Sequence, residues 1–264
     1  GEQSLLYENE TTNIEVIDLY MKGLECFFQV NKENNARARS YIEKALKLEK
    51  TSAGLITLLG WTHFLDFGYS WSDSPLESFT KTEYFVNKAL SLNDSLDAPH
   101  TLLGWIYLHK KEYNEAIAEA NKAVVLNPNG ADALAHLGYI TLMVGEIETA
   151  IIYLKKAFRL NPIPPHYYYY FLGQAYYFAK QYDKAIEIIN QGTIIDPEAF
   201  IQYPILICCY LELNNFDEAQ EAVKKVLEID PNYSLEYNKN ISPMRNQLLL
   251  DKYINTLRKA GLPD

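Results

Sequence analysis

The feature that most constrains this sequence is a period of 34 residues. Alanine, proline and glycine recur in one register, at Ala116, Ala150, Ala185 and Ala219, at Pro128, Pro162, Pro197 and Pro231, and at Gly104, Gly138 and Gly173. Subtracting these positions places the alanines 34, 35 and 34 residues apart, and the prolines keep the same intervals. Three columns in one register predict that a single structural unit is copied along the chain.

Residues 97–130 show the unit most clearly, as two short helical patterns. Gly104 lies on the apolar face of the first pattern, and Ala116, Ala120 and Ala123 share one face of the second. Small side chains at these points allow two helices to approach closely. Pro128 cannot continue the second helix and therefore marks the turn into the next unit. We expect each unit to be a helical hairpin.

A 34-residue period that combines G-x-x-Y, spaced alanines and a closing proline resembles the tetratricopeptide repeat (TPR) signature. The resemblance covers nearly the whole chain. It implies an all-α fold, namely a right-handed α-solenoid superhelix of helix-turn-helix repeats with a C-terminal capping helix. It also implies that the first helix of each repeat lines a concave groove.

We expect a lead-in at 1–13, an array of about six repeats at 14–233, and a loop and capping helix at 234–264. The repeats are expected at 14–52, 53–96, 97–130, 131–165, 166–199 and 200–233. The second carries ten extra residues near 66–75, where Tyr69 and Trp71 either fold over one edge of the solenoid or belong to a packed surface loop. The capping helix is expected at Arg245–Ala260, where its apolar side chains would cover the open end of the array.

The net charge and the cysteine content limit the possible classes of partner and the cellular compartment. A net charge of −10 disfavours nucleic acid and anionic membrane surfaces as partners, because both require basic protein surfaces. No apolar run is long enough for membrane insertion. Cys26, Cys208 and Cys209 are odd in number and have no C-x-x-C spacing, which predicts reduced core thiols and a cytoplasmic protein. Gly1 in place of methionine leads us to expect a segment of a longer protein.

The sequence contains no pattern typical of an enzyme, so we expect no catalysis, no cofactor and no metal site. The five histidines lack ligand spacing, and no phosphate-binding glycine loop or nucleophile motif is present. His100 takes a position that usually holds a core residue in such repeats, and we expect it to be buried.

The candidate binding surface is the groove-facing stripe of the first helices, which steps by three and four residues. Its candidate residues are Trp61, Phe64, Thr101, Trp105, Leu108, Tyr139, Tyr167, Tyr170, Gln174 and Tyr177. Five successive aromatic residues at 167–171 surround a helix, so some are expected to face the groove. Alternatively, these rings pack on the adjacent repeat. TPR arrays that bind chaperones carry Lys, Asn and Arg on this stripe, and those residues are absent here.

The ends of the chain resemble one class of bacterial arrays. Ile17–Gly23 reads I-D-L-Y-M-K-G and resembles an L-Y-x-K-G start, and Leu257–Asp264 reads L-R-K-A-G-L-P-D and resembles an L-R-K-A-G-L-P-[ED] ending. Such arrays follow class III adenylate/guanylate cyclase domains or transcriptional regulators of the CadC type. The resemblance implies a regulatory or sensory arm. No metal-binding aspartate of a cyclase is matched.

Our leading hypothesis is a non-catalytic module that binds a protein or peptide segment in an aromatic groove and regulates a larger bacterial signalling protein. A free-standing TPR adaptor is the first alternative, and a scaffold that self-associates as a homodimer is the second. An enzyme with an undetected site is the third. A CadC-type context would place the array in the periplasm instead of the cytoplasm.

Overall fold

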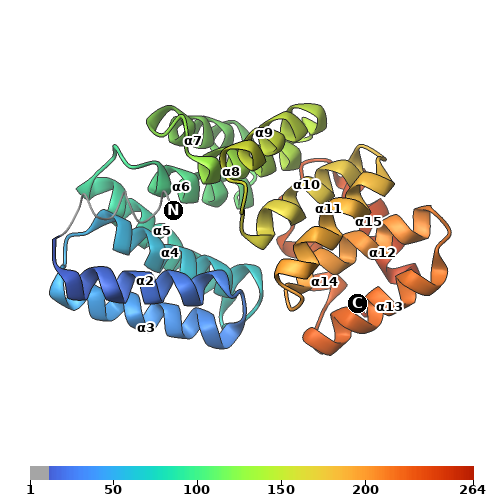
Figure 1. The fold of residues 1–264 in the computed structure, drawn as a ribbon, viewed down its shortest axis with the longest axis horizontal. Helices are drawn as coiled ribbons and strands as arrows, with labels where there is room; N and C mark the ends of the chain where they lie inside the picture. Colours follow the sequence, from blue (N-terminus) through green and yellow to red (C-terminus); the bar gives the residue numbers. More distant parts are fainter. Residues whose placement is uncertain (1–11) are drawn as a thin grey trace. The chain divides into compact units, whose positions relative to one another are not determined.

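The computed structural model describes residues 12–264, and within that range it consists of helices and connecting turns, with no strand (Figure 1). Helices account for 77% of the residues in this range. Successive hairpins are α2 (Ile14–Phe28) with α3 (Lys32–Leu48), α4 (Ala53–Gly68) with α5 (Pro75–Leu92), α6 (Asp97–His109) with α7 (Tyr113–Leu126), α8 (Ala131–Val144) with α9 (Ile147–Leu160), and α10 (His166–Phe178) with α11 (Tyr182–Ile195). The 3-10 helix η1 (Phe200–Gln202), α12 (Tyr203–Glu212), α13 (Phe216–Ile229), α14 (Leu235–Ile241) and α15 (Gln247–Ala260) complete the chain. The expected all-α fold is confirmed.

Short polar side chains determine where several helices begin. Asn13, Asn31, Ser52 and Asn246 each accept a hydrogen bond from a backbone N–H in the first turn of the helix that follows. These bonds satisfy donors that a helix start would otherwise leave unpaired. At the other end of α15, Gly261 adopts a left-handed φ of 106°, which a side chain would strain.

The chain divides into two compact units. One contains residues 12–107 together with Asn114–Ala133, and the other contains Leu108–Tyr113 together with Leu134–Asp264.

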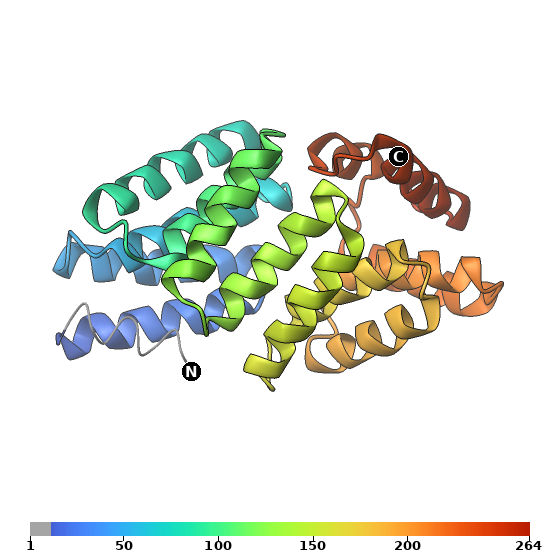
Figure 2. The same ribbon diagram turned by 90° about the horizontal axis from the view of Figure 1, so that it is seen from above.

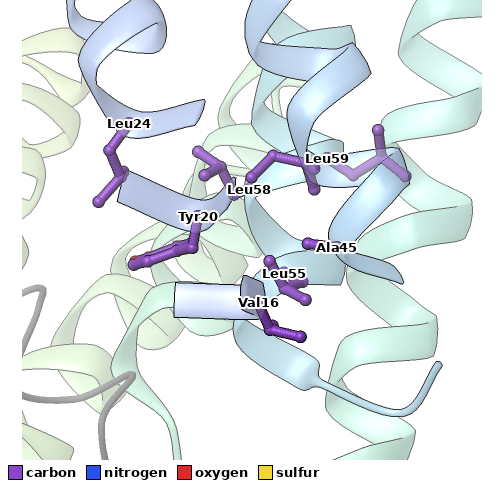
Figure 3. Close-up of a cluster of buried hydrophobic side chains, with 8 residues drawn as sticks. Val16, Tyr20, Leu24, Ala45, Leu55, Leu58 and Leu59 are labelled. Carbon is purple, nitrogen blue, oxygen red and sulfur yellow. The ribbon is translucent and has the colours of Figure 1, made fainter. Parts of the chain in front are cut away.

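One core cluster of the N-terminal unit lies between α2, α3 and α4 (Figure 3). It consists of Val16, Tyr20, Leu24, Ile42, Ala45, Leu55, Leu58 and Leu59. Within α2 these residues recur at every fourth position, which is the spacing of one helical face. Gly23 allows α2 to approach α3 closely, since a Cβ there would lie 2.6 Å from Ile42 Cδ1.

The ten extra residues of the second repeat are mostly helical, which corrects the expected insertion at 66–75. Helix α4 has 16 residues and α5 has 18, compared with 13 and 14 in α6 and α7. Longer helices therefore take up seven of the extra residues, and the connection between them is residues 69–74. Asp66 fixes the added turn of α4, because its carboxylate accepts hydrogen bonds from Asn35 and Arg39. The Tyr69 and Trp71 rings stack on each other, with centroids 4.7 Å apart.

The C-terminal unit contains the hairpins from α8 to α13 and ends in two further helices (Figure 2). Gly138 in α8 marks a close approach between helices, since a Cβ there would lie 2.7 Å from Leu154 Cγ in α9. A loop was expected from 234 to 243, but Leu235–Ile241 forms α14. Helix α15 packs against α12 and α13 through Leu250, Ile254 and Leu257 on its buried face.

Candidate functional site

In the N-terminal unit, three of the candidate aromatic residues form one cluster. Trp61 and Phe64 lie on α4, and Trp105 lies on α6. Their ring centroids are 5.5 Å apart for Trp61–Phe64, 5.4 Å for Phe64–Trp105 and 6.2 Å for Trp61–Trp105, all edge to face. Phe64 is buried, whereas both tryptophans are half-buried. The tryptophans are therefore the members of this cluster that can contact a partner.

Thr101 does not present its hydroxyl to a ligand. Its side chain is buried, and Thr101 Oγ1 donates a hydrogen bond to the Asp97 backbone oxygen at 3.1 Å. This bond lies within α6 and is a local, structural contact. The prediction that Thr101 contacts a ligand is not supported by this arrangement.

In the C-terminal unit, most of the candidate residues are buried. Leu108 is fully inaccessible, and Tyr139, Gln174 and Tyr177 expose 4–7% of their surfaces. A side chain buried to this degree cannot contact a ligand unless its neighbours move. These four residues, predicted to line an open groove, are core residues here.

Tyr170 forms side-chain hydrogen bonds with two of these buried candidates, Tyr139 and Gln174. Burial raises the pKa of the Tyr170 hydroxyl, and its hydrogen bonds with Tyr139 and Gln174 partly oppose that shift. The Tyr139 and Tyr170 ring centroids are 6.1 Å apart. The polar ends of these three side chains therefore lie together between α8 and α10, within an otherwise apolar contact.

Most of the five aromatic residues at 167–171 pack between repeats. Tyr168 and Tyr169 are buried and contact Phe158 of α9 edge to face, at 5.8 and 5.0 Å. Phe171 is also buried and lies 4.3 Å from the Tyr139 ring. Packing on the adjacent repeat, the alternative considered above, therefore accounts for three of the five.

Tyr167 and Tyr170 are the half-buried members of the run. The Tyr167 ring stacks on His136 of α8, with centroids 5.4 Å apart and an interplanar angle of 20°. Of the candidates in this unit, these two tyrosines retain surface that a partner could contact.

Tyr177 is covered by the chain itself. The Tyr253 ring of α15 lies 5.9 Å from the Tyr177 ring and 6.2 Å from the Phe178 ring. Tyr253 lies within the segment expected to form the capping helix, but sequence reasoning did not connect it with the candidate groove. The contact joins residues 76 positions apart, by subtraction, and no local pattern reports it.

The buried histidines have structural partners. His100 Nδ1 lies 2.6 Å from Glu119 Oε2, and His166 Nδ1 lies 3.3 Å from Asp196 Oδ2. The expected burial of His100 is confirmed. Among residues 12–264, no group of three or more His, Cys, Asp or Glu side chains could hold a metal ion. Within the same range, no helix combines the length and apolar character needed to cross a membrane.

Comparison with known proteins identifies the repeat. A family model described as tetratricopeptide repeat matches residues 98–129, the clearest copy of the 34-residue period. The crystal structure of TTC0263, a thermophilic TPR protein in Thermus thermophilus, aligns with a TM-score of 0.57 at 20% identity, over 78% of this chain and all of that chain. Residues 98–129 therefore match the tetratricopeptide repeat, and the chain has the fold of a TPR protein.

Three further comparisons match this chain to proteins of the anaphase-promoting complex. A model for anaphase-promoting complex, cyclosome, subunit 3 matches residues 143–226, and anaphase-promoting complex subunit 3 of Schizosaccharomyces pombe is 24% identical over 181 residues. That alignment covers 67% of this chain and 25% of the yeast protein. The APC/C hetero-tetramer Cut9–Hcn1 aligns with a TM-score of 0.64 at 17% identity, over 98% of this chain and 46% of that chain. This chain therefore spans a quarter to a half of the length of these relatives.

Proposed function

We propose that this TPR protein is a non-catalytic interaction module that binds a peptide or protein segment through aromatic residues of its first helices. The observation that carries the proposal is the Trp61–Trp105 pair. These rings come from the first helices of successive hairpins, contact each other at 6.2 Å, and both remain half-buried. An indole that is packed on one side and accessible on the other combines a rigid apolar surface with an N–H donor. Such residues dominate the energetics of many protein interfaces.

The comparisons support an interaction role. One relative is a subunit of the anaphase-promoting complex, and another is part of a hetero-tetramer, so both occur in multi-protein assemblies. The TPR chain shares a fold with them, and its candidate surface has the aromatic character of a recognition surface. In the C-terminal unit, Tyr167 and Tyr170 are the residues proposed to contribute in the same way.

Peptide display against the full chain tests the proposal. A library of 16-residue peptides is selected on the wild-type chain, and the enriched peptides are measured against Trp61→Ala and Trp105→Ala. Each substitution is expected to weaken binding about 30-fold, which corresponds to roughly 2 kcal/mol for a hot-spot residue.

Tyr84→Ala is the matched control, because Tyr84 is an exposed aromatic residue on α5, outside the stripe. Circular dichroism establishes that each variant remains folded. Enriched peptides that bind both tryptophan variants as tightly as the wild-type chain would refute the proposal.

A second candidate role is the regulatory arm of a bacterial cyclase or CadC-type regulator. The two end motifs favour it, but the same residues also have packing roles. Tyr20 is buried, Gly23 contacts Ile42, and Leu257 and Leu262 are buried. The sequence of the full-length gene product decides this role, since a cyclase or winged-helix domain must precede Gly1. A gene product without such a domain refutes it.

Self-association is the alternative in which the partner is a second copy. Helix α2 leaves Ile14 and Met21 exposed at the first hairpin, with Ile14 exposing 82% of its surface. Sedimentation velocity over a hundredfold concentration range tests it, and Met21→Lys should return any dimer to monomer.

For the cellular compartment, we propose the cytoplasm, because Cys26, Cys208 and Cys209 are buried free thiols. The periplasm is the alternative.

A further inference from the structure

We propose that α15 is a resident ligand of the C-terminal unit, and that a partner segment gains access to the aromatic surface there by displacing it. The partner would have the chemistry of α15 itself, namely an amphipathic helix with an aromatic residue next to a lysine. This inference rests on the proposed interaction role and assigns it a specific surface and a specific competitor.

The centre of the contact is Tyr253. Its ring packs on Tyr177 and Phe178, near the C-terminal end of α10. Burial is the main cause that raises the pKa of the Tyr253 hydroxyl, and the proximity of Tyr233, Cys208, Tyr170 and Tyr177 adds to it.

The Tyr253 ring therefore lies beside Tyr177, one of the candidate residues of α10. Tyr170 and Tyr177 were both predicted to line the groove. In this structure, an aromatic residue of α15 packs against Tyr177.

A neighbouring ion pair sets the register of α15. Lys252 Nζ lies 2.7 Å from Glu212 Oε1 at the C-terminal end of α12. Both side chains are partly accessible, so the pair adds little free energy but favours one alignment of α15 along α12. An aromatic residue that follows a lysine is therefore the recognition element that the surface selects.

The chain preceding α15 is held by polar contacts at the ends of other helices. The Arg245 backbone N–H donates to the Met143 backbone oxygen at 2.9 Å, and its guanidinium lies 5.5 Å from the Tyr113 ring centroid. The backbone of Ile241 forms a hydrogen bond with His109. A solenoid repeat usually contacts only its immediate neighbours, but residues 241–246 reach the ends of α6, α7 and α8. This segment therefore acts as a tether that keeps α15 near its surface.

Tethering explains why a free peptide would bind the closed chain weakly. A short tether holds an occupant at an effective concentration on the order of 1 mM. If α15 and a competitor each have an intrinsic Kd of about 1 μM, the competitor would then show an apparent Kd about a thousandfold weaker. Weakening the resident helix removes much of that competition.

The test uses a fluorescein-labelled peptide of residues 246–264, added to the full chain and followed by anisotropy. The wild-type chain is expected to bind it weakly, because its own α15 fills the surface. A Tyr253→Ala chain is expected to bind the wild-type peptide at least about 30-fold more tightly, since truncation of a half-buried aromatic anchor that acts as a hot spot costs on the order of 2 kcal/mol. Leu248→Ala is the matched control on the same helix, because Leu248 exposes 82% of its surface. This variant should bind the peptide as the wild-type chain does.

A charge reversal tests the register and covers the case in which Tyr253→Ala does not fold. Glu212→Lys lies at an accessible position and should reject the wild-type peptide. The same chain should prefer a Lys252→Glu peptide about threefold to fivefold. Both arms use only sequences of this chain, so they are independent of whether display selects any outside partner. Equal binding of the peptide to the wild-type and a folded Tyr253→Ala chain, or no preference between the two peptides by Glu212→Lys, would overturn the inference.

Discussion

His100 Nδ1 of α6 lies 2.6 Å from Glu119 Oε2 of α7, and His100 Nε2 lies 2.9 Å from the Asp94 backbone oxygen. One buried imidazole therefore connects the two helices of a hairpin with the turn that precedes them. A bulkier apolar residue at this position could fill the same volume but could not join three segments by hydrogen bonds. The pair stabilises the start of the hairpin whose sequence shows the repeat most clearly.

Removing Glu119 should leave one nitrogen of this imidazole without its partner. We expect Glu119→Ala to lower the free energy of unfolding by about 1–3 kcal/mol, the usual cost of an unsatisfied buried polar group. Urea denaturation followed by circular dichroism measures the change. Lys122→Ala on the exposed face of α7 is the control and should differ from wild type by less than about 0.5 kcal/mol. A loss for Glu119→Ala no larger than that of the control would contradict a structural role for the pair.

Acidification should destabilise the fold through two histidines. Burial lowers the pKa of His63 from 6.5 to about 4, with Arg39 nearby acting in the same direction, and burial alone lowers the pKa of His109 to about 4. In each case the unfolded chain binds a proton more readily than the folded one. The stabilisation is thus complete above pH 6.5 and is lost as the pH falls from 6.5 through 4.

His63→Phe isolates one of these two contributions. The His63 ring stacks on Phe85 with an interplanar angle of 7°, so phenylalanine can keep that contact without titrating. The urea midpoint of the variant should decrease less than that of wild type between pH 7 and pH 4.5, a range that limits carboxylate titration. Parallel losses in the two proteins would show that His63 does not contribute.

Gly138→Ala should be destabilising although alanine favours helices. A Cβ at Gly138 would meet Leu154 Cγ at 2.7 Å, and Leu154 is fully buried. Overpacking of this kind costs about 1–3 kcal/mol, which exceeds the roughly 1 kcal/mol gained from helix propensity. Gly68→Ala is the matched control, because no atom lies within 4 Å of a Cβ at that position. Thermal unfolding should place Gly138→Ala below both wild type and Gly68→Ala, and the reverse order would exclude the close helix contact.

The adjacent thiols of α12 should resist alkylation in the folded protein. Burial raises the pKa of Cys209 to about 12 and the pKa of Cys208 well above its usual range, so little reactive thiolate forms. With iodoacetamide at pH 8, mass spectrometry should find both residues unmodified until denaturant is added. An introduced Leu248→Cys, at an exposed position on α15, should react within minutes and reports that the reagent is active. Rapid native modification of Cys208 would show that α12 opens readily.

Sequence reasoning predicted only part of the candidate site. The three- and four-residue spacing selected Trp61 and Trp105, which are half-buried, together with Tyr139 and Tyr177, which are buried. A helical stripe specifies direction, but it does not specify what approaches from that direction. Whether Tyr177 is open or covered depends on Tyr253, which lies far along the chain.

Sequence alone determined the repeat, the all-α class and the helical hairpins, because these follow from local spacing of small residues and prolines along the chain. Tertiary structure decided how the ten extra residues of the second repeat are used. They lengthen α4 and α5, and Asp66 forms contacts with Asn35 and Arg39 that fix the added turn. It also decided which aromatic residues are exposed, since burial depends on contacts between segments that are distant in sequence. Local sequence patterns determine where each helix forms, whereas the exposure of a side chain depends on the tertiary contacts of the folded chain.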